Sequence, residues 1–326
     1  MEYVGIQSQV RRNNLRSTLL LVLFPTLIIG LTWLFFYALF AIGSSEGSYD
    51  ASATMFATNY SFLNALPWVL GICGLWFLIA YFAHSSMINS ATHSHSLSRK
   101  DNKRVYNLTE NLCMANGMQM PKLNVIEDSS INAFASGINK KTYTVTVSRG
   151  AIDKLNDEEL EGVIAHELTH IRNRDVRLLI VSIIFVGIFA FISNLMIRSV
   201  MYGGLGRSRG GGKNGKGGEA VIIILVIVLA AIGYMVSIFL RFAISRKREY
   251  MADAGGAQMT KNPRALASAL RKISGDSRIE SVTRDDVAQL FIEHAAKGKN
   301  EKSSMFSSLF ATHPPIEKRI EILEQF

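Results

Sequence analysis

The segment His166-Glu167-Leu168-Thr169-His170 has the residue types and the spacing of a metal centre. Two histidines four positions apart lie on one face of an α-helix, where both imidazoles can bind one ion. Glu167 lies beside them, where a carboxylate can take a proton from an attacking water. The pattern predicts one Zn²⁺ per chain with His166 and His170 as ligands. A solvated helical face is the alternative interpretation of these residues.

A third protein ligand is needed, because catalytic zinc usually has three and keeps a fourth position open. Glu249 in RKREYMADA is the candidate. If the apolar runs after His170 and before Glu249 form an antiparallel hairpin, both residues lie about 12–13 Å from the ends of those runs, on the same side. An ion pair with the neighbouring arginines is the other role open to Glu249. Asp253, one turn later, either accepts the second N–H of an imidazole or lies on the surface.

Four uncharged apolar runs are each near the roughly 20 residues that cross a hydrocarbon layer of about 30 Å. The first is too long for the apolar core of a cleaved signal peptide, so we interpret it as an anchor. The runs predict a polytopic membrane protein with four transmembrane helices, at residues 17–43, 66–83, 178–197 and 220–240.

The net charge of +9 arises mainly beside these apolar runs, which argues against a nucleic-acid partner and for a lipid bilayer. Residues 44–65 contain no Lys or Arg, so the N-terminus and the large polar segments are expected in the cytoplasm. Residues 198–218 hold five basic side chains, so either they lie outside or the third and fourth runs do not cross fully. The cysteines, Cys73 and Cys113, fit a reducing compartment.

The polar segments predict a small sheet followed by helices. LNVIE, INAFAS and TYTVTVS between residues 123 and 148 alternate as strands do. Asn156 and the three acidic residues after it predict the start of a helix, and no helix breaker follows before residue 197. PRALASALRKI and PPIEKRIEIL near the C-terminus are amphipathic helices by pattern. The fold class is therefore α+β, mostly α.

Two further segments are candidates for a place near the metal. Asn132, Ala133 and Phe134 lie in a strand on which an extended peptide can pair through its backbone, although an internal strand with Phe134 in the core fits equally. His313 precedes two prolines, and it either reaches the site to stabilise an oxyanion or bind the metal, or only marks the start of a helix.

Taken together, HELTH, REYMADA, INAFASG and THPPIEKRI resemble the motifs of the HtpX family of membrane zinc endopeptidases, relatives of the prenyl-protein (CAAX) proteases. The resemblance covers nearly the whole chain. It implies that His166, His170 and Glu249 bind zinc, that Glu167 is the general base, and that the active site faces the cytoplasm from the cell inner membrane. It also implies cleavage of damaged or misfolded membrane proteins in a stress response.

The sequence thus predicts a membrane zinc metalloendopeptidase that acts on protein or peptide substrates, and it predicts no oligomeric state. A non-enzymatic membrane scaffold with a zinc site is one alternative. A prenyl-protein protease is another, although that branch resembles a chain with about seven spans. The predicted division is a membrane hairpin at 1–84, the first part of the catalytic domain at 85–177, a second hairpin with a Gly-rich loop at 178–240, and the second part of the catalytic domain at 241–326.

Overall fold

The structure is a computed structural model that describes residues 6–45, 50–181, 247–276 and 314–326, together with 227, 231 and 292. The chain forms two compact units. One comprises Met1–Ser17, Ala83–Val181 and Phe242–Phe326, and the other comprises Thr18–Phe82 and Ser182–Arg241.

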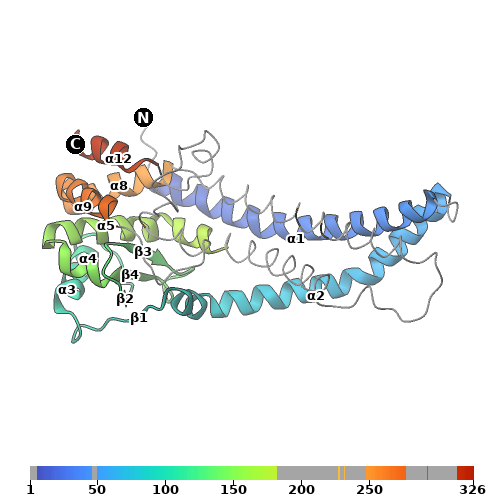
Figure 1. Ribbon diagram of the computed structural model, residues 1–326, viewed down its shortest axis with the longest axis horizontal. Helices are drawn as coiled ribbons and strands as arrows, with labels where there is room; N and C mark the ends of the chain where they lie inside the picture. The colour runs from blue at the N-terminus through green and yellow to red at the C-terminus, as the bar shows by residue number, and fades with distance from the viewer. Residues whose placement is uncertain are drawn as a thin grey trace. The chain divides into compact units, whose positions relative to one another are not determined.

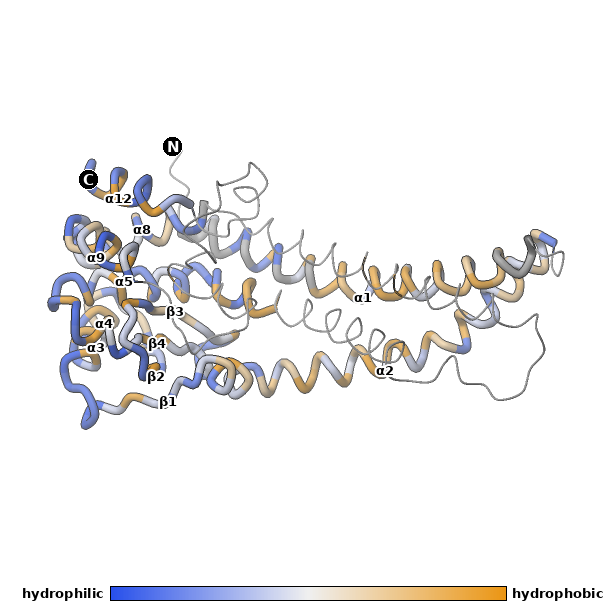
Figure 2. Tube along the Cα trace, in the orientation of Figure 1, coloured by the Kyte–Doolittle hydropathy of each residue, from blue (hydrophilic) through white to orange (hydrophobic). Residues whose placement is uncertain are grey.

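Two long helices, α1 (Ile6–Ser45) and α2 (Ala51–Thr92), contain segments long and apolar enough to cross a membrane. Figure 2 shows apolar residues along most of both helices. Many of their large apolar side chains are exposed rather than packed in a core, as Trp68 at 75% and Phe82 at 77% illustrate. Apolar surface on this scale is unfavourable in water and matches a hydrocarbon layer.

The first two predicted runs lie within these helices, and much of the segment between them, residues 44–65, is helical as well. α2 begins at Ala51, well before residue 66, because Asp50 caps it by accepting a hydrogen bond of 2.7 Å from the Ala53 N–H. Apart from residues 178–181, 227 and 231, the third and fourth runs lie outside the described residues. The four-helix membrane topology therefore stays a prediction.

The unit that includes Ala83–Val181 contains a four-stranded sheet of order β1-β2-β4-β3. β2 and β4 are parallel, whereas β1 and β3 pair antiparallel with β2 and β4 respectively. The three predicted strands are confirmed, and the two-residue β1 was too short to detect from pattern. β3 lies at an edge of the sheet. The strands are β1 (His95–Ser96), β2 (Lys122–Ile126), β3 (Ala133–Ser136) and β4 (Thr144–Ser148).

Helix α5 (Asp157–Asn173) lies at the centre of this unit (Figure 1). It packs against β3 on one side and against α8 and α9 on another, and α12 packs on α8 and α9. Its central position explains why most of its residues are buried. The helices around it are α3 (Lys103–Ala115), α4 (Arg149–Lys154), α8 (Lys247–Thr260), α9 (Pro263–Gly275) and α12 (Ile316–Glu324).

The start of α5 is as predicted, but its end is not. Asn156 and Glu159 form a capping box, each side chain accepting from the other residue's backbone N–H at 2.9 Å. The expected uninterrupted helix to residue 197 is wrong, because Arg174 adopts a left-handed conformation with φ 60° and ends α5. Helix resumes at residues 175–181. No glycine lies at this turn, so the residue pattern did not predict it.

Helix α8 reaches α5 closely because two glycines lie at their crossing. A Cβ on Gly255 would overlap the Thr169 side chain, and one on Gly256 would lie 3.1 Å from the backbone nitrogen of His166. Any larger residue at Gly255 must separate the two helices. This close approach positions everything that α8 presents to α5.

Gly255→Ala should destabilise the protein by about 1–3 kcal/mol, the usual cost of overpacking, despite the better helix propensity of alanine. Gly275→Ala is the matched control, since Gly275 is also helical and a Cβ there meets nothing within 4 Å. Thermal unfolding in detergent measures both variants. Equal midpoints for Gly255→Ala and Gly275→Ala would show that the crossing tolerates a wider spacing.

Candidate metal centre

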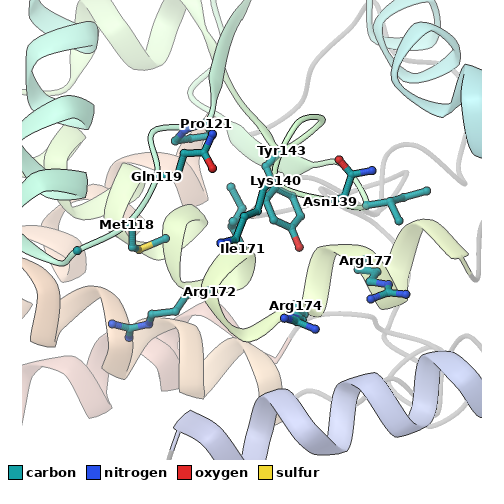
Figure 3. Close-up of a pocket in the computed structure, with 12 residues that line it drawn as sticks. Met118, Gln119, Pro121, Asn139, Lys140, Tyr143, Ile171, Arg172, Arg174 and Arg177 are labelled. Carbon is teal, nitrogen blue, oxygen red and sulfur yellow. The ribbon is translucent and has the colours of Figure 1, made fainter.

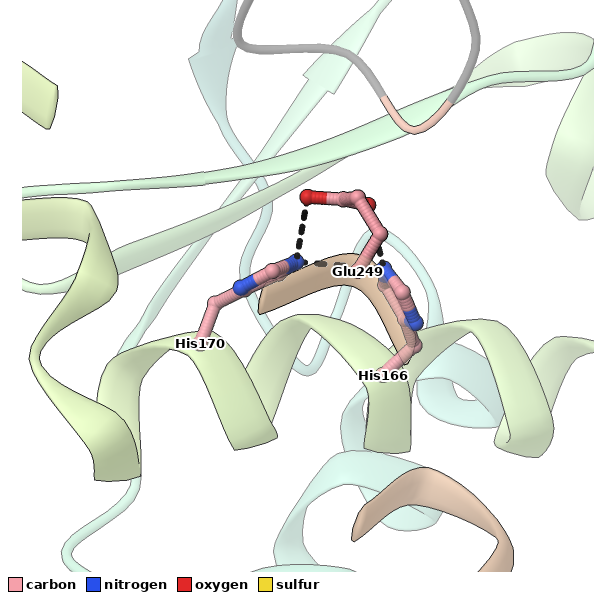
Figure 4. Close-up of side chains that lie close together, drawn as sticks. All are labelled: His166, His170 and Glu249. Carbon is pink, nitrogen blue, oxygen red and sulfur yellow. Dashed lines mark hydrogen bonds and ion pairs between the residues drawn. The ribbon is translucent and has the colours of Figure 1, made fainter. Parts of the chain in front are cut away.

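Helices α5 and α8 bring three side chains to one point (Figure 4). Nε2 of His166 and Nε2 of His170 lie 3.2 Å apart. The Glu249 carboxylate lies 3.6 Å from the first nitrogen and 3.7 Å from the second. One ligand atom from each residue lies within 4.8 Å of the others. The predicted trio is therefore together in space, although helix α5 turns at Arg174 instead of running straight into the next apolar run.

The donor set fits a metal ion. Zinc–ligand bonds of about 2.0–2.1 Å in a tetrahedron separate the ligand atoms by about 3.3–3.4 Å, close to the separations seen among these residues. His166 is fully buried, and only 7% of Glu249 is exposed. Glu249 therefore faces the imidazoles rather than forming the exposed ion pair considered from sequence. Two imidazole nitrogens and a carboxylate facing one point suit a borderline divalent cation.

Each imidazole has a carboxylate behind it. Asp253 Oδ1 lies 3.0 Å from His166 Nδ1, although the contact is poorly aligned for a hydrogen bond. Asp175 Oδ2 lies 3.2 Å from His170 Nδ1. Such carboxylates orient a ligand imidazole and raise its basicity. Asp253 was a sequence candidate for this position, whereas Asp175 was missed because it follows the unpredicted turn at Arg174.

Arg319 on α12 completes the group and was also missed by the sequence analysis. Its side chain is fully buried, and its Nε and Nη2 donate to the two carboxylate oxygens of Asp253 at 2.9 and 2.8 Å. Its Nη1 lies 3.9 Å from Glu249 Oε2. A two-pronged arginine is well suited to a buried carboxylate. The available signal was an arginine within THPPIEKRI, a motif noted for other reasons.

These contacts set the charges of the three candidate ligands and of Asp253. Burial by itself lowers the pKa of His166, but contacts with Asp253 and Glu249 outweigh burial and raise it to about 9. Burial raises the pKa of Asp253, but Arg319 and His166 outweigh that effect and lower it to about 2. The site thus favours positive charge at the position between the imidazoles, where a cation would bind.

Glu167 lies on the same helix and is only 2% exposed. Burial raises the pKa of its carboxyl, opposed by the nearby His166 and His170, and the backbone N–H of Ala135 donates to it. A carboxyl with a raised pKa is a stronger base than an ordinary carboxylate, which suits it to take a proton from water and return it. Its contact with Ala135 places Glu167 next to the edge strand β3.

Both sequence interpretations of Asn132, Ala133 and Phe134 describe part of what is observed. The Phe134 side chain is fully buried, as in the core interpretation. The backbone nevertheless belongs to an edge strand, and the Ala133 carbonyl accepts a hydrogen bond of 3.0 Å from the Ile292 N–H. β3 can therefore accept a backbone donor from outside the sheet. His313 lies outside the described residues.

Comparison with known proteins decides the family. The model of peptidase family M48 matches residues 99–326, which include every residue of the site described above. The chain belongs to peptidase family M48. The family match makes it a metalloprotease, and His166, His170 and Glu249 form a group that could hold the metal ion.

Relatives of this M48 chain are named as proteases. It is 60% identical to the protease HtpX homolog of Bacteroides fragilis over the whole of both chains. It is 37% identical to the protease HtpX homolog of Listeria monocytogenes over 81% of this chain and 87% of the other. The crystal structure of S. mikatae Ste24p is more distant, with 19% identity and a TM-score of 0.47 over 81% of this chain and 58% of that one. The resemblance to the HtpX family is confirmed.

Metal-free protein should lose stability as the pH rises from about 6.5 to 9. A raised pKa of His166 means that the folded state holds a proton that the unfolded state releases, so its stabilising effect is complete below pH 6.5 and is lost through pH 9. Thermal unfolding of chelator-treated protein measures the trend. His166→Gln is the control and should show a flatter profile, and a wild-type midpoint that rises across this window would contradict the assignment.

Proposed function

We propose that this M48 protease is a membrane-bound zinc endopeptidase in which His166, His170 and Glu249 hold the metal and Glu167 is the general base. The observation that carries the proposal is the convergence of the three side chains, with Asp175 and Asp253 behind the two imidazoles. Closed structural zinc sites prefer four Cys or His ligands. A trio of two imidazoles and one carboxylate leaves a position for substrate, which favours catalysis over a scaffold.

Each residue of the proposed site has a separate role in peptide hydrolysis. When bound, zinc supplies Lewis-acid polarisation of the scissile carbonyl and of the attacking water. Glu167 accepts the proton of that water and delivers it to the nitrogen of the leaving amine. The Ala135 N–H holds the Glu167 carboxylate in place before the reaction. Asp253 and Asp175 keep the two imidazoles turned toward the metal.

We propose that the substrate binds along the edge of strand β3. An extended peptide there adds a strand to the sheet, using backbone groups as Ile292 does at Ala133. This alignment suits an endopeptidase, because backbone pairing requires neither end of the substrate. It also places the peptide beside Glu167, which contacts Ala135 two residues further along the same strand.

The proposed substrates are membrane proteins, including damaged or misfolded ones, cleaved at the cytoplasmic face of the cell inner membrane. The support is the joining of a metalloprotease unit to helices long and apolar enough to cross a membrane. The absence of Lys and Arg between residues 44 and 65 supports an external position for that segment.

Glu167→Gln should keep about one zinc per chain and lower the cleavage rate at least about 100-fold, because it removes a proton carrier and no ligand. Glu249→Gln should lose zinc and activity together, since a neutral amide replaces a carboxylate poorly at a metal. Metal content by mass spectrometry and digestion of a membrane protein in detergent measure both effects.

Glu161→Gln is the matched control for these variants. Glu161 lies on α5, as Glu167 does, and it is not one of the three candidate metal ligands. It should keep both zinc and activity. Stoichiometric zinc in Glu249→Gln would place the third ligand elsewhere. Loss of zinc in Glu167→Gln would contradict its assignment as the base.

The proposed orientation predicts which cysteines react from outside the cell. In a background with Cys73→Ala and Cys113→Ala, Ala51→Cys should react with an impermeant thiol reagent applied to intact cells, whereas Lys141→Cys should react only after lysis. Gly211→Cys should behave like Ala51→Cys if the third and fourth apolar runs cross fully. Labelling of Lys141→Cys in intact cells would reverse the orientation.

A further inference from the structure

A cavity of about 360 Å³ lies in the same unit as the metal centre but is lined by a different set of residues (Figure 3). It is bounded by the end of α5, by the turn between β3 and β4, and by the loop before β2. Figure 3 shows Arg174 across this space from the Tyr143 hydroxyl, with Lys140 beside Tyr143. The metal ligands do not line it, so the cavity needs another explanation.

The cavity is strongly basic. Lys140, Arg172, Arg174 and Arg177 line it, and none of the lining residues within the described part of the chain is acidic. Arg174 donates to a neutral partner, the Asn14 amide oxygen, at 3.0 Å. Arg177 Nε is buried and has no hydrogen-bond partner within the described part of the chain. Four like charges around one hollow repel one another, and an anion relieves that repulsion.

Tyr143 also lines the cavity and lies near these charges. Burial raises the pKa of its hydroxyl, while Arg174 and Arg177 act in the opposite direction, as cations near a phenol oxygen do. The hydroxyl therefore lies within electrostatic range of both guanidinium groups. It can also donate a hydrogen bond to an anion held between them.

The cavity lies where a membrane-crossing helix begins. Asn14, the residue that accepts from Arg174, is the first residue of the candidate span Asn14–Ala41. The cavity lining also includes the apolar side chains of Met118 and Ile171. Basic groups beside apolar side chains at the start of a span match the headgroup region of a bilayer, where anionic lipids present phosphates.

We propose that this basic cavity binds the phosphate of an anionic phospholipid headgroup, with Lys140, Arg174 and Arg177 as the main contacts. Arg172 and the Tyr143 hydroxyl complete the anion site. The cavity is distinct from the metal centre, and its occupancy requires no proteolysis. Asp175 directly follows Arg174 and contacts His170, one of the three candidate metal ligands. A lipid bound to Arg174 therefore restrains the residue next to Asp175.

The test is titration of short-chain phosphatidylglycerol into full-length, metal-loaded protein in a neutral detergent, followed by thermal unfolding. Wild type should show a saturable rise in midpoint. Phosphatidylcholine of the same chain length should give at most a tenth of that rise. Inorganic phosphate should need at least about 100-fold higher concentration, because it lacks the apolar part of the lipid. If phosphatidylcholine or inorganic phosphate raised the midpoint as much as phosphatidylglycerol at the same concentration, the lipid assignment would be overturned.

Lys140 and Lys141 provide a matched pair, since they are neighbours on one turn and only Lys140 lines the cavity. Lys140→Gln should weaken phosphatidylglycerol binding about five-fold, the worth of one basic residue near an anionic surface, and Lys140→Gln with Arg177→Gln about 25-fold. Lys141→Gln should change it less than two-fold. Lys140 is exposed, so its single variant is expected to fold even if the double variant does not.

Equal weakening by Lys140→Gln and Lys141→Gln would mean a diffuse surface charge and would overturn the site. Competition by an acidic peptide at the same concentration as the lipid would assign the cavity to protein ligands and overturn the proposal too. Proteolytic activity of the variants is measured separately with a soluble peptide in lipid-free detergent, where Lys140→Gln should match wild type. Loss of that activity would tie the cavity to the substrate rather than to lipid.

Discussion

The crossing of α5 and α8 is the contact on which the rest of this protein depends. The two histidines and the proposed base lie on α5, but the third member of the trio comes from a helix about 80 residues further along the chain. Gly255 and Gly256 let the helices approach to backbone distance, which brings Glu249 within reach of both imidazoles. A metal centre is sensitive to shifts of a fraction of an ångström, so small residues at this crossing serve the chemistry as well as the packing.

Charge balance is the second requirement of the site. Glu249, Asp253, Asp175 and Glu167 are all nearly buried around two imidazoles, and buried carboxylates are costly unless they are paired. Arg319 supplies the compensating cation with a two-pronged contact to Asp253 and a longer approach to Glu249. The position between the imidazoles remains the natural place for a further positive charge. Two imidazole nitrogens and a carboxylate oxygen that face one point suit a divalent ion there.

The features of the fold and of the candidate site that depend on residues close together in the chain were predictable from the sequence. The spacing of His166 and His170 and the cap at Asn156 depend on neighbours within one or two turns, and both are seen as expected. The three longer strands follow from alternation. Arg174 and Arg319 were beyond such reasoning, for different reasons. A left-handed arginine is held by tertiary contacts, and the partner of a buried arginine is fixed only once distant helices have packed.

The buried pairing of Arg319 with Asp253 has a consequence for how this site tolerates substitution. Removing one partner of a buried ion pair leaves the other charge uncompensated, which typically costs about 3–5 kcal/mol. A lysine in place of Arg319 keeps the charge but cannot match both oxygens of Asp253 as the guanidinium does. Changes at Asp253 and Arg319 are therefore energetically coupled, although the two residues lie on different helices.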